Sequence, residues 1–265
     1  MDLDVALRRL AADPTARVDV AAVCLHLSAD EYPGLNVAAY RNTLAALADA
    51  VRPRIQAADT LPGKVAALAT FLFAEQGFAG NADDYYDPRN SYLCDVLDRK
   101  LGLPITLSIV AAAVGTRAGL AVAGVGLPGH FVAKAAVGSQ QVLFDPFHGG
   151  RPLSKGDCER LVSGVTGQPF AATDGALAAT PPGFVVQQVL NNLKGVYLRQ
   201  PDYPRAARVT GRLVQLLPGE PTQRRDLGVS LLHAGRPGPA IDHLAAYLAS
   251  VPDADDADAV TAFLK

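Results

Sequence analysis

The chain has 265 residues, of which 49% are hydrophobic and 19% are charged, and its formal net charge is −2 at pH 7. This length supports one large domain or two ordinary ones, and the charge gives no basic surface of the kind that nucleic acids require. The first residues carry acids and no apolar core, unlike a signal peptide, and no apolar run approaches the roughly 18 residues of a membrane helix.

The cysteines indicate a reducing environment. There are three, Cys24, Cys94 and Cys158, and no two of them form a C-x-x-C pair. An odd, sparse set is not a disulfide framework and lacks zinc-ligand spacing. We therefore expect a cytoplasmic protein with no metal and no cofactor, and the composition is typical of a bacterial protein.

Residues 1–60 are predicted to form a helical N-terminal region, because apolar residues recur three to four positions apart. Pro53 is expected to end the helix that contains it. A further helix begins near Pro62 and ends at Gly77.

A polar loop rich in Asn, Asp and Tyr follows, and a helix is predicted from Ser91, with Ser91 as its cap and Gly102 at its end. Pro104 then begins a helix over 104–118 that is almost wholly apolar. A helix that is apolar all round is a buried helix, so we expect it at the centre of its domain.

From Gly119 the sequence period changes. Short Val-rich runs separated by Gly, Pro and Ser predict strands over 120–127, 130–137 and 140–147, with a hairpin turn at "GSQ". Helices followed by an antiparallel meander make the fold class α+β, with a buried helix against a sheet.

Only helical patterns follow residues 171–184, a Gly- and Pro-rich stretch that reads as a linker or a loosely packed excursion. Within 185–265, Pro218 aligns with Pro252 at an offset of 34 residues, which is the tetratricopeptide period. Two such units are fewer than the roughly three that stand alone. We therefore expect these helical hairpins to pack on the preceding domain.

His130 and Asp145 are the first candidates for chemistry, because they lie on neighbouring predicted strands. An aspartate that orients a histidine next to a nucleophile is a common catalytic pair. The nucleophile would lie at the start of the buried helix, where the helix dipole stabilises an anion. The alternative is that "PGH" and "DPF" are ordinary turn sequences.

The chain closely resembles the bacterial SirB family, in which a transglutaminase-like core precedes tetratricopeptide-like helices. The resemblance covers nearly the whole chain, and its long motifs are "NSYL" at 90–93, "GLPITLS" at 102–108, "GVGLPGHF" at 124–131, "DPFHGG" at 145–150 and "LNNLKGVYLR" at 190–199. It implies a papain-like core over 61–175, followed by tetratricopeptide-like repeats over 185–265.

In active transglutaminase-like enzymes a cysteine begins the central helix, and a histidine and an aspartate follow on two strands. His130 and Asp145 match the second and third members, but the predicted helix over 104–118 contains no cysteine. Thr106 and Ser108 carry hydroxyls near that place, although a hydroxyl is a weaker nucleophile unless it is activated. Cys94 lies one helix too early and reads as a structural thiol.

Four other residues are candidates for lining the same cleft, and Cys94 is one of them. Asn90 and Ser91 lie between the polar loop and a helix, where the simpler interpretation is a helix cap. His148 either faces the cleft or lies in an exposed turn. The remaining histidines have no ligand spacing.

Two functions compete. A non-catalytic transglutaminase-like module would bind a peptide or protein through its cleft and repeats, acting as a regulatory or structural partner. The alternative is a hydrolase or acyl transferase that uses His130, Asp145 and a hydroxyl or thiol. Neither involves nucleic acid or membrane, and the oligomeric state is left open.

Overall fold

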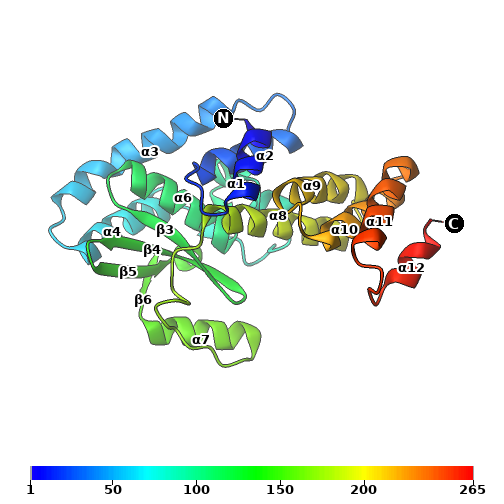
Figure 1. Cartoon of the computed structure of the whole chain (residues 1–265). Coiled ribbons are helices and arrows are strands. Elements are labelled where there is room, and N and C mark those ends of the chain that lie inside the picture. Colours follow the sequence, from blue (N-terminus) through cyan, green and yellow to red (C-terminus); the bar gives the residue numbers. More distant parts are fainter. Residues whose placement is uncertain (1, 265) are drawn as a thin grey trace. The chain divides into compact units, whose positions relative to one another are not determined.

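The computed structural model describes residues 2–264. They form two compact units (Figure 1). The sheet unit is Arg17–Val185, and the repeat unit joins the segment that ends at Ala16 to the segment that begins at Val186.

The sheet unit contains one antiparallel meander in the strand order β3-β4-β5-β6. Gly129 and Gly138, both with positive φ, occupy the turns on either side of β4. A short parallel pair, β1 with β2, lies outside this meander. The strands are β1 Ala79–Gly80, β2 Leu101–Gly102, β3 Val122–Leu127, β4 His130–Val137, β5 Gln140–Asp145 and β6 Arg151–Leu153.

Helices cover both faces of the meander (Figure 1). α6 packs on β3 and β4 while α4 packs on β4 and β5, and α7 contacts β4 and β6 from the other face. The helices of this unit are α2 Val20–Glu31, α3 Val37–Ala57, α4 Leu61–Ala69, α5 Leu93–Arg99, α6 Pro104–Arg117 and α7 Lys155–Thr166; a π-helical turn, Thr70–Glu75, continues α4. The predicted α+β class, with a helix against an antiparallel sheet, is therefore confirmed.

α6 is the central helix that the sequence predicted. Its residues from Pro104 to Ala111 are all buried, and it contacts helices α2, α3, α4 and α5 as well as the sheet. Its uninterrupted apolar character follows from this position, because every side of the helix meets protein.

Two predicted helix ends were wrong. α3 continues through Pro53 to Ala57; Pro53 lies on an exposed side of the helix, where water can bond the carbonyl that loses its donor. α5 ends at Arg99, with Lys100 in the left-handed conformation at φ 61°. Gly102 is instead a strand residue, and a Cβ there would come within 2.8 Å of the Thr106 hydroxyl.

Ser91 does not cap α5 as predicted. The N-cap residue is Tyr92, and Ser91 closes a preceding 3-10 turn, η2 Pro88–Asn90, by donating its backbone N–H to Pro88. The Pro88 ring fixes a backbone angle that suits the first position of such a turn.

The stretch predicted as a linker is packed instead. Ala172 and Leu177 are buried against the apolar face that α7 covers. Thr180 bonds to the backbone of β3 at Gly124 and Gly126, and Lys134 donates to the carbonyl of Leu177. The chain therefore covers the sheet before α8 begins at Pro182.

In the repeat unit, consecutive helices pack as neighbours, α9 on α10 and α10 on α11, and α1 packs on α9. α9 and α11 begin 34 residues apart, at Tyr203 and Pro237, which confirms the predicted period. The helices are α1 Leu3–Ala12, α8 Pro182–Arg199, which begins in the sheet unit, α9 Tyr203–Leu216, α10 Pro221–His233, α11 Pro237–Ser250 and α12 Ala257–Ala262.

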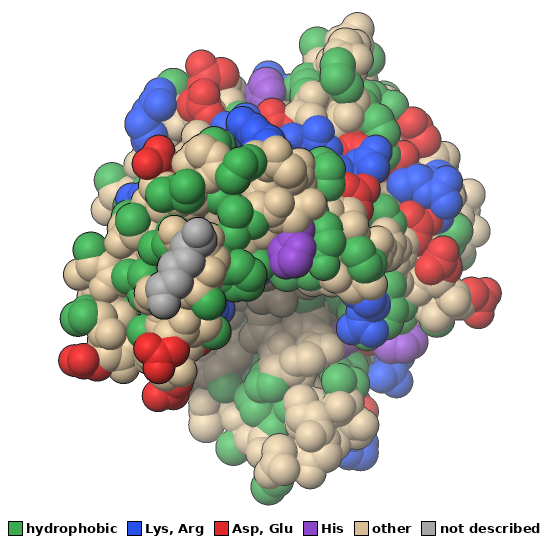
Figure 2. Space-filling model, turned by 90° about the vertical axis from the view of Figure 1, so that its right-hand side faces the viewer, with side chains coloured by type: hydrophobic (Ala, Val, Ile, Leu, Met, Phe, Trp, Pro, Cys, Tyr) green, Lys and Arg blue, Asp and Glu red, His purple; other side chains and the backbone are tan. Residues whose placement is uncertain are grey.

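The surface carries charges of both signs. On the face drawn in Figure 2, Lys and Arg side chains lie among Asp and Glu side chains, in keeping with a net charge of −2. In the part of the chain that the structure describes, no helix combines the length and apolar character of a membrane span.

Candidate functional site

The two ends of a strand pair bring the candidate histidine and aspartate together. His130 is the first residue of β4, directly after the Pro128–Gly129 turn, and Asp145 is the last residue of β5. β4 and β5 are antiparallel neighbours, so the start of one lies beside the end of the other. A 3-10 turn, η3 Pro146–His148, follows Asp145 and ends at His148.

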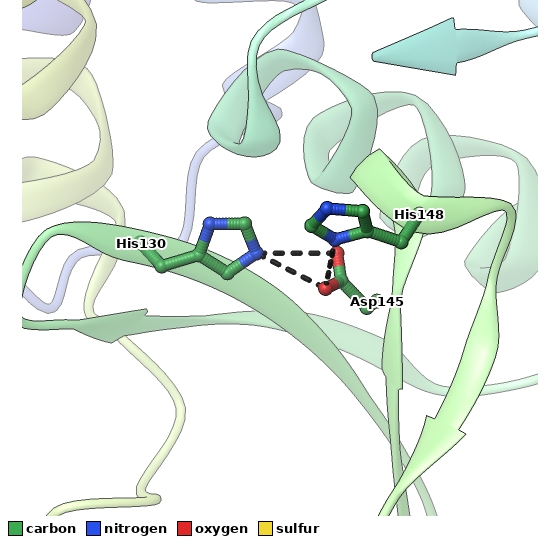
Figure 3. Close-up of side chains that lie close together, drawn as sticks. All are labelled: His130, Asp145 and His148. Carbon is green, nitrogen blue, oxygen red and sulfur yellow. Dashed lines mark hydrogen bonds and ion pairs between the residues drawn. The ribbon is translucent and has the colours of Figure 1, made fainter. Parts of the chain in front are cut away.

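Three side chains converge there (Figure 3). His130 Nε2 lies 3.2 Å from each carboxylate oxygen of Asp145, and His148 Nδ1 lies 2.7 Å from Asp145 Oδ2. Because an ionised carboxylate only accepts hydrogen bonds, both ring nitrogens donate to it. The predicted contact between His130 and Asp145 is thus confirmed.

Asp145 is a buried, ionised carboxylate, with an exposed fraction of 0%. Burial alone would raise its pKa, but hydrogen bonds and attraction from His130 and His148 outweigh burial and hold the pKa below its usual value. The backbone N–H of Phe147 also donates to Oδ1. Asp145 therefore anchors both histidines.

For His148 the sequence left two positions open, one facing the cleft and one in an exposed turn. Its side chain is half exposed, 52% against 7% for His130, so the expected turn position is right, yet the ring also bonds to Asp145. The signal was present in the sequence: the spacing of three residues in "DPFH" closes one 3-10 turn and stacks positions 145 and 148.

Neither candidate hydroxyl bonds to His130. Thr106 Oγ1 donates to the carbonyl of Asn90 at 2.8 Å and accepts from the N–H of Leu103 at 2.9 Å, and Ser108 Oγ donates to the carbonyl of Pro104 at 2.8 Å. Both residues are 0% exposed. Such bonds are structural, because they complete the helix start or bond back to the preceding turn.

Ser108 lines a cavity beside α6. This cavity, of about 620 Å³, runs beside α6 and β3, and its lining includes Ser108, Phe131 and Arg41 but neither His130 nor Asp145. Its walls are mainly apolar, as in small-molecule sites. Ser108 therefore lines a cavity to which neither His130 nor Asp145 contributes.

All three cysteines are buried, and none of them forms a disulfide. Burial raises the pKa of Cys24 to about 12 and that of Cys94 to about 11, and it raises the pKa of Cys158 as well. A thiol of this kind holds very little thiolate at neutral pH.

Asn90 acts as a structural hub of the polar loop. Its amide nitrogen donates to the carbonyls of Asp84 and Tyr85, and its side-chain oxygen accepts from Asn81. Ser91 is also buried, and its Oγ has no hydrogen-bond partner within the described residues. Both residues therefore sit inside the protein rather than on an open cleft wall.

Three aromatic side chains, Tyr85, Tyr86 and Phe147, lie beside the histidines and form what we call the aromatic rim. The Phe147 ring lies 6.1 Å from the His130 ring and 6.2 Å from the Tyr85 ring, measured between centroids. Tyr85 and Tyr86 form an edge-to-face pair and are 39% and 48% exposed. The tyrosine rings of the rim thus offer apolar surface beside the site, and their hydroxyls can form hydrogen bonds.

Two family models match the chain. One, described as "Transglutaminase-like superfamily", matches residues 38–191, which is more than half of the chain and contains the site. The other, described as "Tetratricopeptide repeat", matches residues 193–265.

Curated relatives are mainly bacterial. A UPF0162 protein of Xylella fastidiosa (strain Temecula1) is 36% identical over 245 residues, which is 91% of this chain and 86% of that protein. A UPF0162 protein of Vibrio cholerae is 26% identical and covers 61% of this chain and 60% of its own. F-box only protein 21 of Mus musculus is 30% identical over 36% of this chain and 17% of its own. No solved structure matches.

Proposed function

Since the chain belongs to the transglutaminase-like superfamily and both candidate hydroxyls bond to the backbone instead of to His130, we propose that it is a non-catalytic, peptide- or protein-binding module of regulatory role. One observation carries the proposal: both hydroxyls at the start of α6 are buried and bonded to the backbone. A histidine–aspartate pair without a nucleophile forms no covalent intermediate.

Two surfaces support binding. Tetratricopeptide repeats generally present a recognition surface for other proteins, and the chain has such a region at 193–265. The aromatic rim adds the exposed rings of Tyr85 and Tyr86 beside His130, and tyrosines of this kind are common in recognition sites. The free cysteines support a cytoplasmic, reducing setting for these contacts.

The experiment is a peptide selection followed by a binding and turnover measurement. A random peptide library is selected against the immobilised full chain, and fluorescence anisotropy gives the Kd of the consensus peptide. We expect a micromolar or tighter Kd, and recovery of the intact peptide after a day with the protein. Failure to select any binder would overturn the proposal.

Matched variants locate the surface. Tyr86→Ala removes an exposed ring of the rim, and Val137→Ala removes an exposed apolar side chain, 50% exposed, at the far end of β4. We expect Tyr86→Ala to weaken the selected peptide about tenfold, since an aromatic anchor carries much of a binding energy, and Val137→Ala to leave the Kd unchanged within twofold. Equal Kd values for both variants would move the binding surface away from the rim.

A hydrolase or acyl transferase is the second candidate, and the 3.2 Å contact between His130 and Asp145 favours it. The same peptide, incubated with the protein and a fluorescent primary amine, separates the two functions. Cleavage or amine incorporation that disappears in His130→Ala would establish catalysis.

A further inference from the structure

His130, Asp145 and His148 form a cluster of metal-ligand type. Each offers one atom, and these atoms all lie within 4.8 Å of one another. The shorter separations are 3.2 Å for His130 Nε2 to Asp145 and 2.7 Å for His148 Nδ1 to Asp145. Ligands that bind one ion at about 2.0–2.2 Å lie roughly 3–4 Å apart, so the two separations from Asp145 are near the spacing that a bound ion imposes.

The donor set is also one that first-row metals use. Two imidazole nitrogens and a carboxylate oxygen are zinc ligands, and a site with three protein ligands keeps a position open. Each imidazole can carry its proton on its other ring nitrogen, so the nitrogen that faces Asp145 can offer a lone pair. The hydrogen-bonded and metal-bound states therefore use the same three atoms.

Charge gives a second argument. Asp145 is fully buried, and its ion-pair partners in the described chain are the two histidines alone, which are cationic only when protonated. Asp87, another buried carboxylate, pairs with both Arg89 and Arg99. A buried carboxylate without a permanent cation beside it is costly, and a divalent ion would supply that charge.

The backbone holds the ligands in place without the ion. The Phe147 N–H fixes Asp145 Oδ1, and the Gly150 N–H donates to the Asp145 carbonyl. Gly149 and Gly150 take positive φ of 73° and 74°, which closes the turn that carries His148. The His148 side chain is 52% exposed, so one residue of the cluster lies at the surface of the protein.

We propose that His130, Asp145 and His148 bind one divalent transition-metal ion of the zinc class, with at least one coordination position open to water or to a ligand. This site goes beyond the proposed binding function and does not rest on it. It also departs from the expectation of no metal, which came from cysteine spacing alone.

The test uses the full chain, with any affinity tag removed, after treatment with a chelator and exhaustive dialysis. Zn²⁺ is titrated by calorimetry, and Co²⁺ is added as a spectroscopic probe. We expect one Zn²⁺ per chain with a Kd of about 1 µM or below, and visible Co²⁺ absorption typical of nitrogen and oxygen ligands in fewer than six positions.

Two histidine variants complete the test. His148→Ala removes an exposed ligand and should weaken Zn²⁺ at least 100-fold while circular dichroism stays unchanged. His233→Ala, in α10 of the repeat unit, removes a histidine that faces Tyr203 and should leave the Kd unchanged. Absence of Zn²⁺ binding below about 100 µM would overturn the proposal, and so would equal Zn²⁺ affinity in His148→Ala and the unaltered protein.

Discussion

At the scale of single residues, burial decides what the cysteines can do. Cys24, Cys94 and Cys158 are 1%, 3% and 0% exposed. The Cys94 backbone N–H donates to the Ser28 hydroxyl oxygen, and that hydroxyl in turn donates to the Cys24 carbonyl. Cys24 and Cys94 therefore belong to the helix packing, whereas Cys158 also feels the charge of Asp145, which helps to raise its pKa.

Alkylation should reflect that burial. We expect iodoacetamide at neutral pH to label Cys94 at least about 100-fold more slowly in the folded protein than in urea, since a pKa of about 11 leaves little thiolate. His130→Ala should leave the rate unchanged. Mass spectrometry maps the labelled sites. Rapid labelling of Cys94 that His130→Ala abolishes would instead move the protein to the catalytic class.

Asp87 shows how a buried carboxylate is stabilised in the polar loop. Burial alone would raise its pKa, but the side-chain and backbone hydrogen bonds of Arg89 and the charges of Arg99 and Arg89 lower it below the usual 3.8. The folded protein thus releases the proton more readily than the unfolded chain. The stabilisation is present above the unfolded pKa and is lost as pH falls through the folded pKa.

Asp87→Asn should therefore lower the free energy of unfolding by about 2 kcal/mol at pH 7, because charge-assisted hydrogen bonds are lost. The difference from the unaltered protein should shrink below about pH 4. Urea denaturation at pH 7, 5 and 3.5 measures it. Asp83→Asn, an exposed change of the same charge, is the control and should stay within about 0.5 kcal/mol. A difference that is the same at pH 7 and pH 3.5 would contradict the assignment.

At the scale of elements, α10 and α11 approach closely at one glycine. A Cβ on Gly228 would lie 2.6 Å from the Leu244 side chain and 3.2 Å from the Ala240 carbonyl oxygen. Gly211, in the interior of α9, has open space at the same place. These two helix glycines therefore have opposite roles.

Gly228→Ala should lower the free energy of unfolding of the repeat unit by about 1–3 kcal/mol, because an added methyl group overpacks a tight contact. Gly211→Ala should raise it by about 0.5–1 kcal/mol, since alanine favours a helix interior. Hydrogen exchange of the α10 amides measures both changes. A stabilised Gly228→Ala variant would show that the helices separate more easily than this contact implies.

At the scale of the whole molecule, the N-terminal helix α1 belongs to the same unit as the C-terminal helices. α1 packs on α9, and Asp4 pairs with Arg212 across 208 positions of sequence. Leu7 and Leu10 of α1 are buried, at 0% and 1% exposure. The sequence predicted a separate helical region over 1–60, whereas contacts group the segment up to Ala16 with the C-terminal helices.

Leu7→Ala should consequently destabilise the repeat unit by about 2–5 kcal/mol through the cavity that it leaves. Val5→Ala, on the exposed side of the same helix at 43% exposure, should change stability by no more than about 0.5 kcal/mol. Exchange of the α9 amides reports the effect. Equal exchange rates in the two variants would mean that α1 does not support α9.

The sequence by itself determined the local structure of this protein. The apolar run of 104–118 predicted a buried helix, and alternating Val-rich runs predicted the meander, because periodicity reflects which side of an element is buried. The 34-residue offset likewise predicted paired helices. These properties depend on neighbours in the sequence.

Only the tertiary structure decided the composition of the site. Three features depend on packing between distant segments. His148 and His130 both bond to Asp145, the Thr106 hydroxyl donates to the Asn90 carbonyl, and Ser108 lines a separate cavity. Hydrogen-bond partners are set by the nearest polar group in three dimensions, and sequence spacing fixes that group only within one turn or one hairpin.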